Sequence, residues 1–236
     1  MKVDKIYNMD CIDGMKKIDD ESINLVFSDI PFNINIGKRT KSRHNGFKGK
    51  SYKDNLSDKK YFDLINSWIK ESHRILKYDG TIIVMTGWTN LKDILNSLDV
   101  NNFYILNHCI VKYAFGVYTK KRFVTSHYHI IFATKSNKLW TFNKQKKYDE
   151  DVWMMNREFK SKELNHPCPT TYEWVKKIIL TSSNENDLIL DSFMGTGTTS
   201  LVCIKTNRHF IGFEISEEYC NIANKRLKEI LKKEMK

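Results

Sequence analysis

The strongest constraint on the fold is a repeated order of strand and helix in the C-terminal third of the chain. Apolar residues 188–190 lead through Asp191 and a glycine turn into a predicted helix at residues 198–205. A further strand at residues 210–213 and an amphipathic helix at residues 216–233 follow. Strands that alternate with helices form a parallel sheet with helices on both faces, so an α/β fold is predicted.

The N-terminal part of the chain adds further elements to this sheet. Apolar runs predict strands, and apolar residues at helical spacing predict helices. The expected strands are residues 23–27, 81–85, 104–111 and 128–133, and the expected helices are residues 61–76 and 170–180. Because 236 residues suit one domain with a full core, we expect a single domain over residues 1–236.

The charge balance favours a polyanionic partner. The chain has 39 Lys and Arg residues against 28 Asp and Glu residues, a net charge of +11, which attracts nucleic acid before anionic membrane. Five cysteines form no CxxC pair, which argues against a zinc site or a disulfide framework, and no metal is expected. The sequence has neither a signal-peptide pattern nor an apolar run long enough to span a bilayer. We therefore expect a cytoplasmic protein without a membrane partner.

The glycine turn has the features of a cofactor site. It reads Asp-Ser-Phe-Met-Gly-Thr-Gly-Thr-Thr from Asp191 to Thr199, between a strand and a helix. Open α/β sheets bind ligands there, because glycines admit the ligand and the helix N-terminus offers free N–H groups. Glu214 ends the next strand, where an acid can accept hydrogen bonds from ribose hydroxyls. Ser200 replaces the third glycine of the dinucleotide pattern, which disfavours a nicotinamide dehydrogenase.

A second motif, Asp29-Ile30-Pro31-Phe32, follows the buried strand at residues 23–27. Together with the glycine turn and Gly212-Phe213-Glu214, it resembles the Asp-Pro-Pro-Tyr tetrapeptide and cofactor motif of the amino-methylating DNA methyltransferases. The tetrapeptide precedes the glycine turn, an order similar to that of the β class of this family. The resemblance implies a Rossmann-like, circularly permuted fold that uses S-adenosyl-L-methionine. It also implies that residues 5–8 form the third strand of the sheet. Tyr128 departs from the family, which often has Glu at that position.

The resemblance also implies roles for the residues of the cofactor motif. It places Asp191 on the methionyl amine, the backbone of residues 195–198 around the methionyl carboxylate, and Glu214 on the ribose. Asp10 and Cys11 would face the adenine ring of the cofactor, although Asp10 is equally suited to cap a helix. The predicted cofactor-binding residues are Asp10, Cys11, Asp191, Phe193, Gly195, Thr196, Gly197, Thr198, Thr199 and Glu214.

The predicted catalytic residues are Asp29, Ile30, Pro31 and Phe32. An adenine amine is a poor nucleophile because its lone pair is delocalised into the ring, so both N–H groups need acceptors that favour a pyramidal nitrogen. The Asp29 carboxylate and the Ile30 carbonyl are the candidate acceptors, and Pro31 pushes Ile30 toward an extended conformation. Phe32 would stack on the flipped-out base. Asp29 favours adenine N6, because Ser usually stands there in enzymes that methylate cytosine N4.

DNA is the predicted partner, and two segments are candidates to contact it. One is a basic loop at about residues 37–60, and the other is a short target-recognition insert at about residues 137–165. The predicted DNA-binding residues of the loop are Lys38, Arg39, Lys41, Arg43, Lys48, Lys50 and Lys53. A cytosine-N4 methyltransferase, an RNA amine methyltransferase and an inert nucleic-acid-binding module stay open. A companion restriction endonuclease and a homodimer also stay open.

Overall fold

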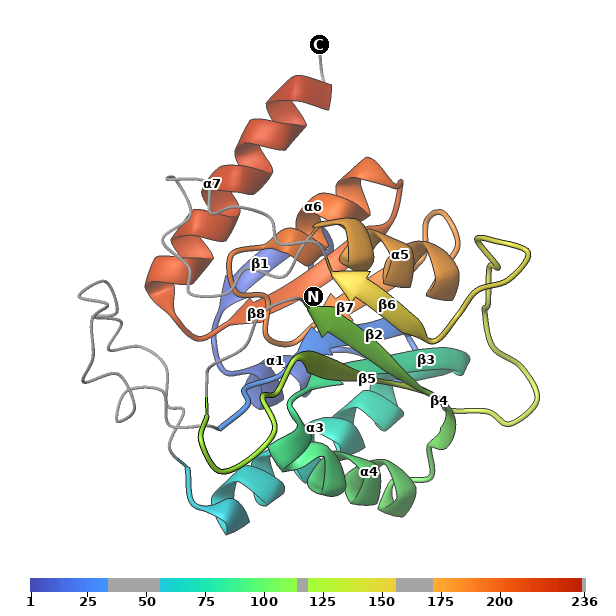
Figure 1. Ribbon diagram of the computed structural model, residues 1–236. Coiled ribbons are helices and arrows are strands. Elements are labelled where there is room, and N and C mark those ends of the chain that lie inside the picture. Colours follow the sequence, from blue (N-terminus) through green and yellow to red (C-terminus); the bar gives the residue numbers. More distant parts are fainter. Residues whose placement is uncertain (34–55, 114–118, 156–171, 235–236) are drawn as a thin grey trace.

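The computed structural model describes residues 1–33, 56–113, 119–155 and 172–234, and they form one sheet between two layers of helices (Figure 1). Within these residues the sheet has eight strands in the order β1-β8-β7-β2-β3-β5-β4-β6. The strands are β1 (Lys5–Asn8), β2 (Ile23–Asp29), β3 (Leu76–Thr86), β4 (Tyr104–Tyr113), β5 (His127–Thr134), β6 (Val152–Met155), β7 (Leu188–Asp191) and β8 (His209–Glu214). The helices are α1 (Cys11–Met15), α3 (Asp58–Ile75), η1 (Trp88–Asn90), α4 (Leu91–Val100), α5 (Tyr172–Ser182), α6 (Thr198–Lys205) and α7 (Glu217–Glu234).

The directions of the strands determine which strand ends lie at each edge of the sheet. Strands β1, β8, β7, β2 and β3 run parallel, so their carboxyl ends share one edge. Strand β5 runs antiparallel to both β3 and β4. The start of β5 and the end of β4 therefore reach the same edge as the carboxyl ends of the parallel strands.

Each face of the sheet has its own apolar core. One core packs α1, α3 and α4 on the sheet, with Trp68 and Ile94 fully buried. The other packs α5, α6 and α7 on the opposite face, with Val175 and Val202 fully buried. Strand β2 supplies both cores, and Leu25, Val26 and Phe27 are at most 1% exposed. A strand covered on both faces requires a continuous apolar run, which is why its sequence shows no alternation.

The α/β class and the mostly parallel sheet are confirmed, but several elements differ from those expected, and the short helices α1 and η1 were not predicted. Strand β3 begins at Leu76 rather than residue 81, because residues 77–80 form an irregularity between the Leu76 and Thr81 pairings with β2. Helix α4 was not predicted, although Leu91, Ile94, Leu95 and Leu98 have helical spacing. Strand β6 was not predicted, because a four-residue edge strand with exposed Val152 and Met154 leaves no apolar run.

The first half of the predicted insert, residues 137–155, packs along the sheet and α5. The Asn143 backbone N–H donates to the Thr181 carbonyl across 2.7 Å, and its side chain donates to Ser183 across 2.9 Å. Residues 156–165 of the insert lie outside the described residues. None of the described helices combines the length and apolar character needed to cross a membrane.

Candidate active site

The carboxyl edge of the parallel strands brings together acidic residues from distant parts of the sequence. Asp29 ends β2, Asp191 ends β7 and Glu214 ends β8. Asn8, which ends β1, pairs with Glu214 and donates its side-chain amide to the Glu214 carbonyl across 2.8 Å. Ligands of open α/β sheets bind outside this edge, so the fold joins the two predicted motifs in one site.

The glycine turn has a backbone that only glycine adopts easily. Gly195 and Gly197 have φ values of +55° and +87°, in the left-handed region. Gly197 is the Ncap residue immediately before helix α6, and a Cβ there would lie 2.9 Å from the Ala223 Cβ on α7. It provides no side-chain cap, so α6 starts with N–H groups that no Ncap side chain satisfies.

Arg226 on α7 donates hydrogen bonds to the glycine turn, a contact that sequence reasoning missed. Its Nη1 donates to the Thr196 carbonyl across 2.6 Å and to the Thr196 Oγ1 across 3.3 Å. Burial lowers the pKa of Arg226. A signal was available, because Arg226 stands three residues after Ala223 and beside Leu227 on the buried stripe of α7.

The Glu214 carboxylate joins the glycine turn to the residues before α7. Its Oε2 accepts from the Gly195 N–H across 2.9 Å, and its Oε1 accepts from the Ser216 N–H across 2.7 Å. Burial raises the pKa of Glu214 despite these bonds. Each carboxylate oxygen can accept a further hydrogen bond, so the geometry suits a ligand with vicinal hydroxyls.

Asp191 lies deeper than expected, at 4% exposure. Its carboxylate accepts from the Thr199 Oγ1 across 2.5 Å, from the Phe193 N–H across 3.1 Å and from the Ser28 Oγ across 3.4 Å. Burial raises the pKa of Asp191 to about 6. These bonds hold the cofactor turn against β2, and the predicted contact with a methionyl amine stays a prediction.

Asp10 and Cys11 are structural in this arrangement. The Asp10 Oδ1 accepts from the Ile12 N–H across 2.9 Å and caps α1, as its alternative interpretation predicted. Cys11 is 6% exposed and packs in the core beneath α1, where burial raises its pKa to about 12. Whether either residue also contacts a cofactor stays a prediction.

The backbone of the predicted catalytic tetrapeptide, residues 29–32, is held by side chains from two helices. The Tyr61 hydroxyl on α3 donates to the Pro31 carbonyl across 2.8 Å. The Asn90 side-chain amide, at the start of α4, donates to the Phe32 carbonyl. Sequence reasoning missed both residues, because a buried Tyr or a helix-start Asn is ordinary in any core.

An aromatic row begins at the tetrapeptide. The Phe32 ring lies 5.7 Å from the Tyr128 ring, and Tyr128 lies 4.8 Å from the Tyr113 ring, between ring centroids. Tyr128, the position that departs from the family pattern, therefore lies beside the residue predicted to stack on the base.

The family model described as a DNA methylase of the N6/N4 type matches residues 23–225, which include both motifs. The chain belongs to this DNA methylase family. The methylase is 33% identical to the type II methyltransferase M.HinfI of Haemophilus influenzae over 94% of its own length and 67% of that protein. It is 30% identical to the DNA adenine methyltransferase YhdJ of Escherichia coli, over 94% of its own length and 82% of that protein.

A solved structure supports the same fold. The methylase superposes on the M1.HpyAVI–SAM complex with a TM-score of 0.74 and 24% identity, over 94% of this chain and 98% of that one. The methylase is thus an S-adenosylmethionine-dependent enzyme of the group that methylates exocyclic amines in DNA.

The predicted DNA-binding residues Lys38 to Lys53 lie outside the described residues, so the structure leaves their role a prediction.

Proposed function

We propose that this methylase transfers a methyl group to the N6 amine of an adenine that is flipped out of DNA. The observation that carries the proposal is the bond between Ser28 and Asp191, 3.4 Å long, which joins the strand that ends in Asp29 to the start of the cofactor turn. This connection brings the predicted amine acceptor and the predicted cofactor cradle to the same edge of the sheet.

The site has the donors and acceptors that S-adenosylmethionine needs. The uncapped start of α6 suits the methionyl carboxylate, and the Glu214 carboxylate suits the ribose hydroxyls. Asp191 would face the methionyl amine, with Phe193 and Thr199 beside it. When bound, the cofactor supplies an electrophilic methyl group on its sulfonium.

The tetrapeptide would hold and activate the amine. The Asp29 carboxylate and the Ile30 carbonyl accept its two N–H groups, and Phe32 stacks on the base. Tyr61 and Asn90 hold the carbonyls of Pro31 and Phe32, which restricts the tetrapeptide to one geometry. Rate enhancement then comes from positioning, without a covalent intermediate on the protein.

Adenine is favoured over cytosine by Asp29 and by the likeness to YhdJ, a DNA adenine methyltransferase. Cytosine N4 is the second candidate, because the family model covers both amines. We also propose the circularly permuted order of the β class, with β1 as the third strand of the unpermuted sheet. A companion endonuclease and a homodimer stay proposals.

The test is to incubate the purified protein with labelled S-adenosylmethionine and unmethylated DNA, beside an equal amount of RNA. Nucleoside analysis should find N6-methyladenine in the DNA. N4-methylcytosine would overturn the base assignment, and label in RNA alone would overturn the substrate class. No label in either nucleic acid would overturn the enzyme proposal.

A further inference from the structure

A short basic loop leaves the sheet at the catalytic edge, between β4 and β5. The described part, residues 119–126, is the yellow-green turn that extends beyond the sheet in Figure 1. It returns to the sheet at Ser126, whose carbonyl accepts from the Tyr113 N–H across 2.9 Å. Tyr128, two residues later, contacts the Phe32 ring. The loop therefore lies next to the site proposed for the flipped base.

Phe123 is presented to solvent by this loop. Its side chain is 99% exposed, although water contact with a phenylalanine ring is unfavourable. The turn before it is closed by Thr119, whose Oγ1 accepts from the Arg122 N–H across 3.2 Å and donates to the Arg122 carbonyl across 2.8 Å. A closed turn displays the ring in a defined place.

The residues before Phe123 are all cationic and exposed: Lys120, Lys121 and Arg122. A row of cations beside an exposed aromatic ring matches the chemistry of a DNA groove, where phosphates flank stacked bases. Phe123 stands five positions before Tyr128, a span of at most about 17 Å when extended. Phe123 can therefore reach the base stack while Phe32 contacts the flipped base.

We propose that Phe123 enters the base stack of duplex DNA at the position vacated by the flipped nucleotide, while Lys120, Lys121 and Arg122 contact the flanking phosphates. This inference rests on the proposed function, because only an enzyme that flips a base leaves such a gap. Flipping costs unpairing and unstacking energy, and an apolar side chain that fills the gap recovers part of the stacking.

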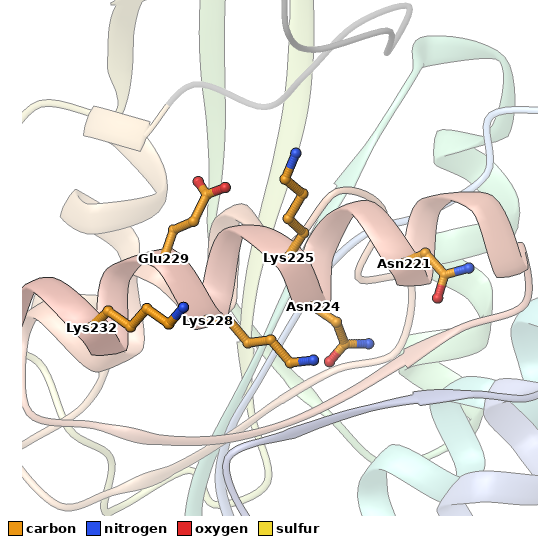
Figure 2. A pocket seen from close by; sticks show the side chains of 6 residues that line it. All are labelled: Asn221, Asn224, Lys225, Lys228, Glu229 and Lys232. Carbon is orange, nitrogen blue, oxygen red and sulfur yellow. The ribbon is translucent and has the colours of Figure 1, made fainter.

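A second cationic surface provides a matched control. Helix α7 presents Lys225, Lys228 and Lys232 around a shallow hollow. Figure 2 shows Lys225 and Glu229 on one side of the helix and Lys228 with Asn224 on the other. At about 1.5 Å per residue, Lys232 stands roughly 22 Å from the start of α7, where the helix leaves the cofactor edge. The three lysines of α7 thus carry the same charge as the three cations of the loop but lie away from the site proposed for the flipped base.

The first experiment compares Phe123→Ala with the wild type on native and heat-denatured portions of the same DNA. Initial methylation of native DNA should fall at least about tenfold, while methylation of denatured DNA, where no pair must open, should change less than about threefold. Phe123→Leu, which keeps an apolar wedge, should recover most of the native-DNA rate. Tyr78→Ala, at 55% exposure on the opposite edge of the sheet, should leave both rates unchanged.

Equal losses on native and denatured DNA, or no loss on native DNA, would overturn the wedge. An equal loss of the native-DNA methylation rate in Phe123→Ala and Phe123→Leu would also overturn it, because an apolar side chain would then not suffice. If the wild type methylates DNA and these results occur, the wedge fails while the proposed function stands. If the wild type methylates no DNA, the proposed function fails and the wedge fails with it.

The second experiment tests the cations by binding alone. Lys120→Ser, Lys121→Ser and Arg122→Ser together should reduce the slope of log affinity against log salt by about two to three units for duplex DNA. The α7 control, with Lys225, Lys228 and Lys232 each replaced by Ser, removes the same charge and should leave the slope unchanged. Equal slopes for the two triple variants would mean that net charge, rather than this loop, attracts the DNA.

Discussion

The Tyr61 hydroxyl donates a hydrogen bond to the Pro31 carbonyl across 2.8 Å, which joins helix α3 to the tetrapeptide that is proposed to be catalytic. Tyr61 is 1% exposed, so solvent cannot replace the bond. Asn90 holds the next carbonyl, that of Phe32, from the start of α4. Two helices of one core thus position the segment that is proposed to bind the amine.

Tyr61→Phe should slow the chemical step while leaving cofactor binding unchanged. The variant keeps the buried ring and removes one hydrogen bond worth about 1 kcal/mol, so kcat should fall about three- to tenfold. Steady-state kinetics and the cofactor Kd measure the two effects. Tyr78→Phe, which removes an exposed hydroxyl, is the control. A rise in KM at constant kcat would contradict a positioning role.

Asp29→Ala should abolish turnover without weakening the binding of the cofactor. Asp29 is proposed to accept a hydrogen bond from the reacting amine, so its loss should reduce kcat by about a hundredfold or more. The cofactor Kd should stay within about threefold, since cofactor contacts come from other strands. Single-turnover rates and equilibrium binding separate the two quantities. Substantial remaining activity would show that Asp29 is not the amine acceptor.

Gly197→Val should prevent cofactor binding. A branched residue would be strained at a φ of +87°, and its Cβ would lie 2.9 Å from Ala223. We expect the Kd for S-adenosylmethionine to rise at least about a hundredfold, as measured by calorimetry. Gly87→Ala is the matched control, because a Cβ there would lie 3.5 Å from the Phe32 ring, an ordinary contact. Normal binding by Gly197→Val would place the cofactor elsewhere.

The affinity for the cofactor should fall as pH falls through about 6. Burial raises the pKa of Asp191 to about 6, so the carboxyl is largely protonated below this pH. A ligand ammonium favours the ionised form, which means that binding requires loss of the proton at low pH. Affinity should therefore drop about tenfold per pH unit below pH 6 and level off above it.

Asp191→Asn isolates this effect from that of Glu214, whose pKa burial also raises. The variant should bind more weakly at neutral pH and lose the part of the pH dependence that belongs to Asp191. Calorimetry across the same pH range measures both constants. An unchanged profile in Asp191→Asn would restrict Asp191 to its bonds with Ser28, Thr199 and Phe193.

Much of the fold could be predicted because its signals are local. The run at residues 23–27 is apolar throughout, as a strand buried on both faces must be, and it became β2. The glycine turn carries its own conformational requirement at Gly195 and Gly197, both of which have positive φ. Strand β6 could not be predicted, because pairing with β4 rather than apolar periodicity makes it a strand.

The sequence by itself determined the α/β class, the two motifs and the family, since each depends on residues that lie close together in the chain. Only the tertiary structure decided which residues meet across it: Ser28 with Asp191, separated by 163 positions, and Arg226 with Thr196, separated by 30. It also decided that antiparallel β5 begins, after the loop that carries Phe123, at the edge where the parallel strands end. Such contacts follow from strand order and direction in the sheet, which local spacing does not encode.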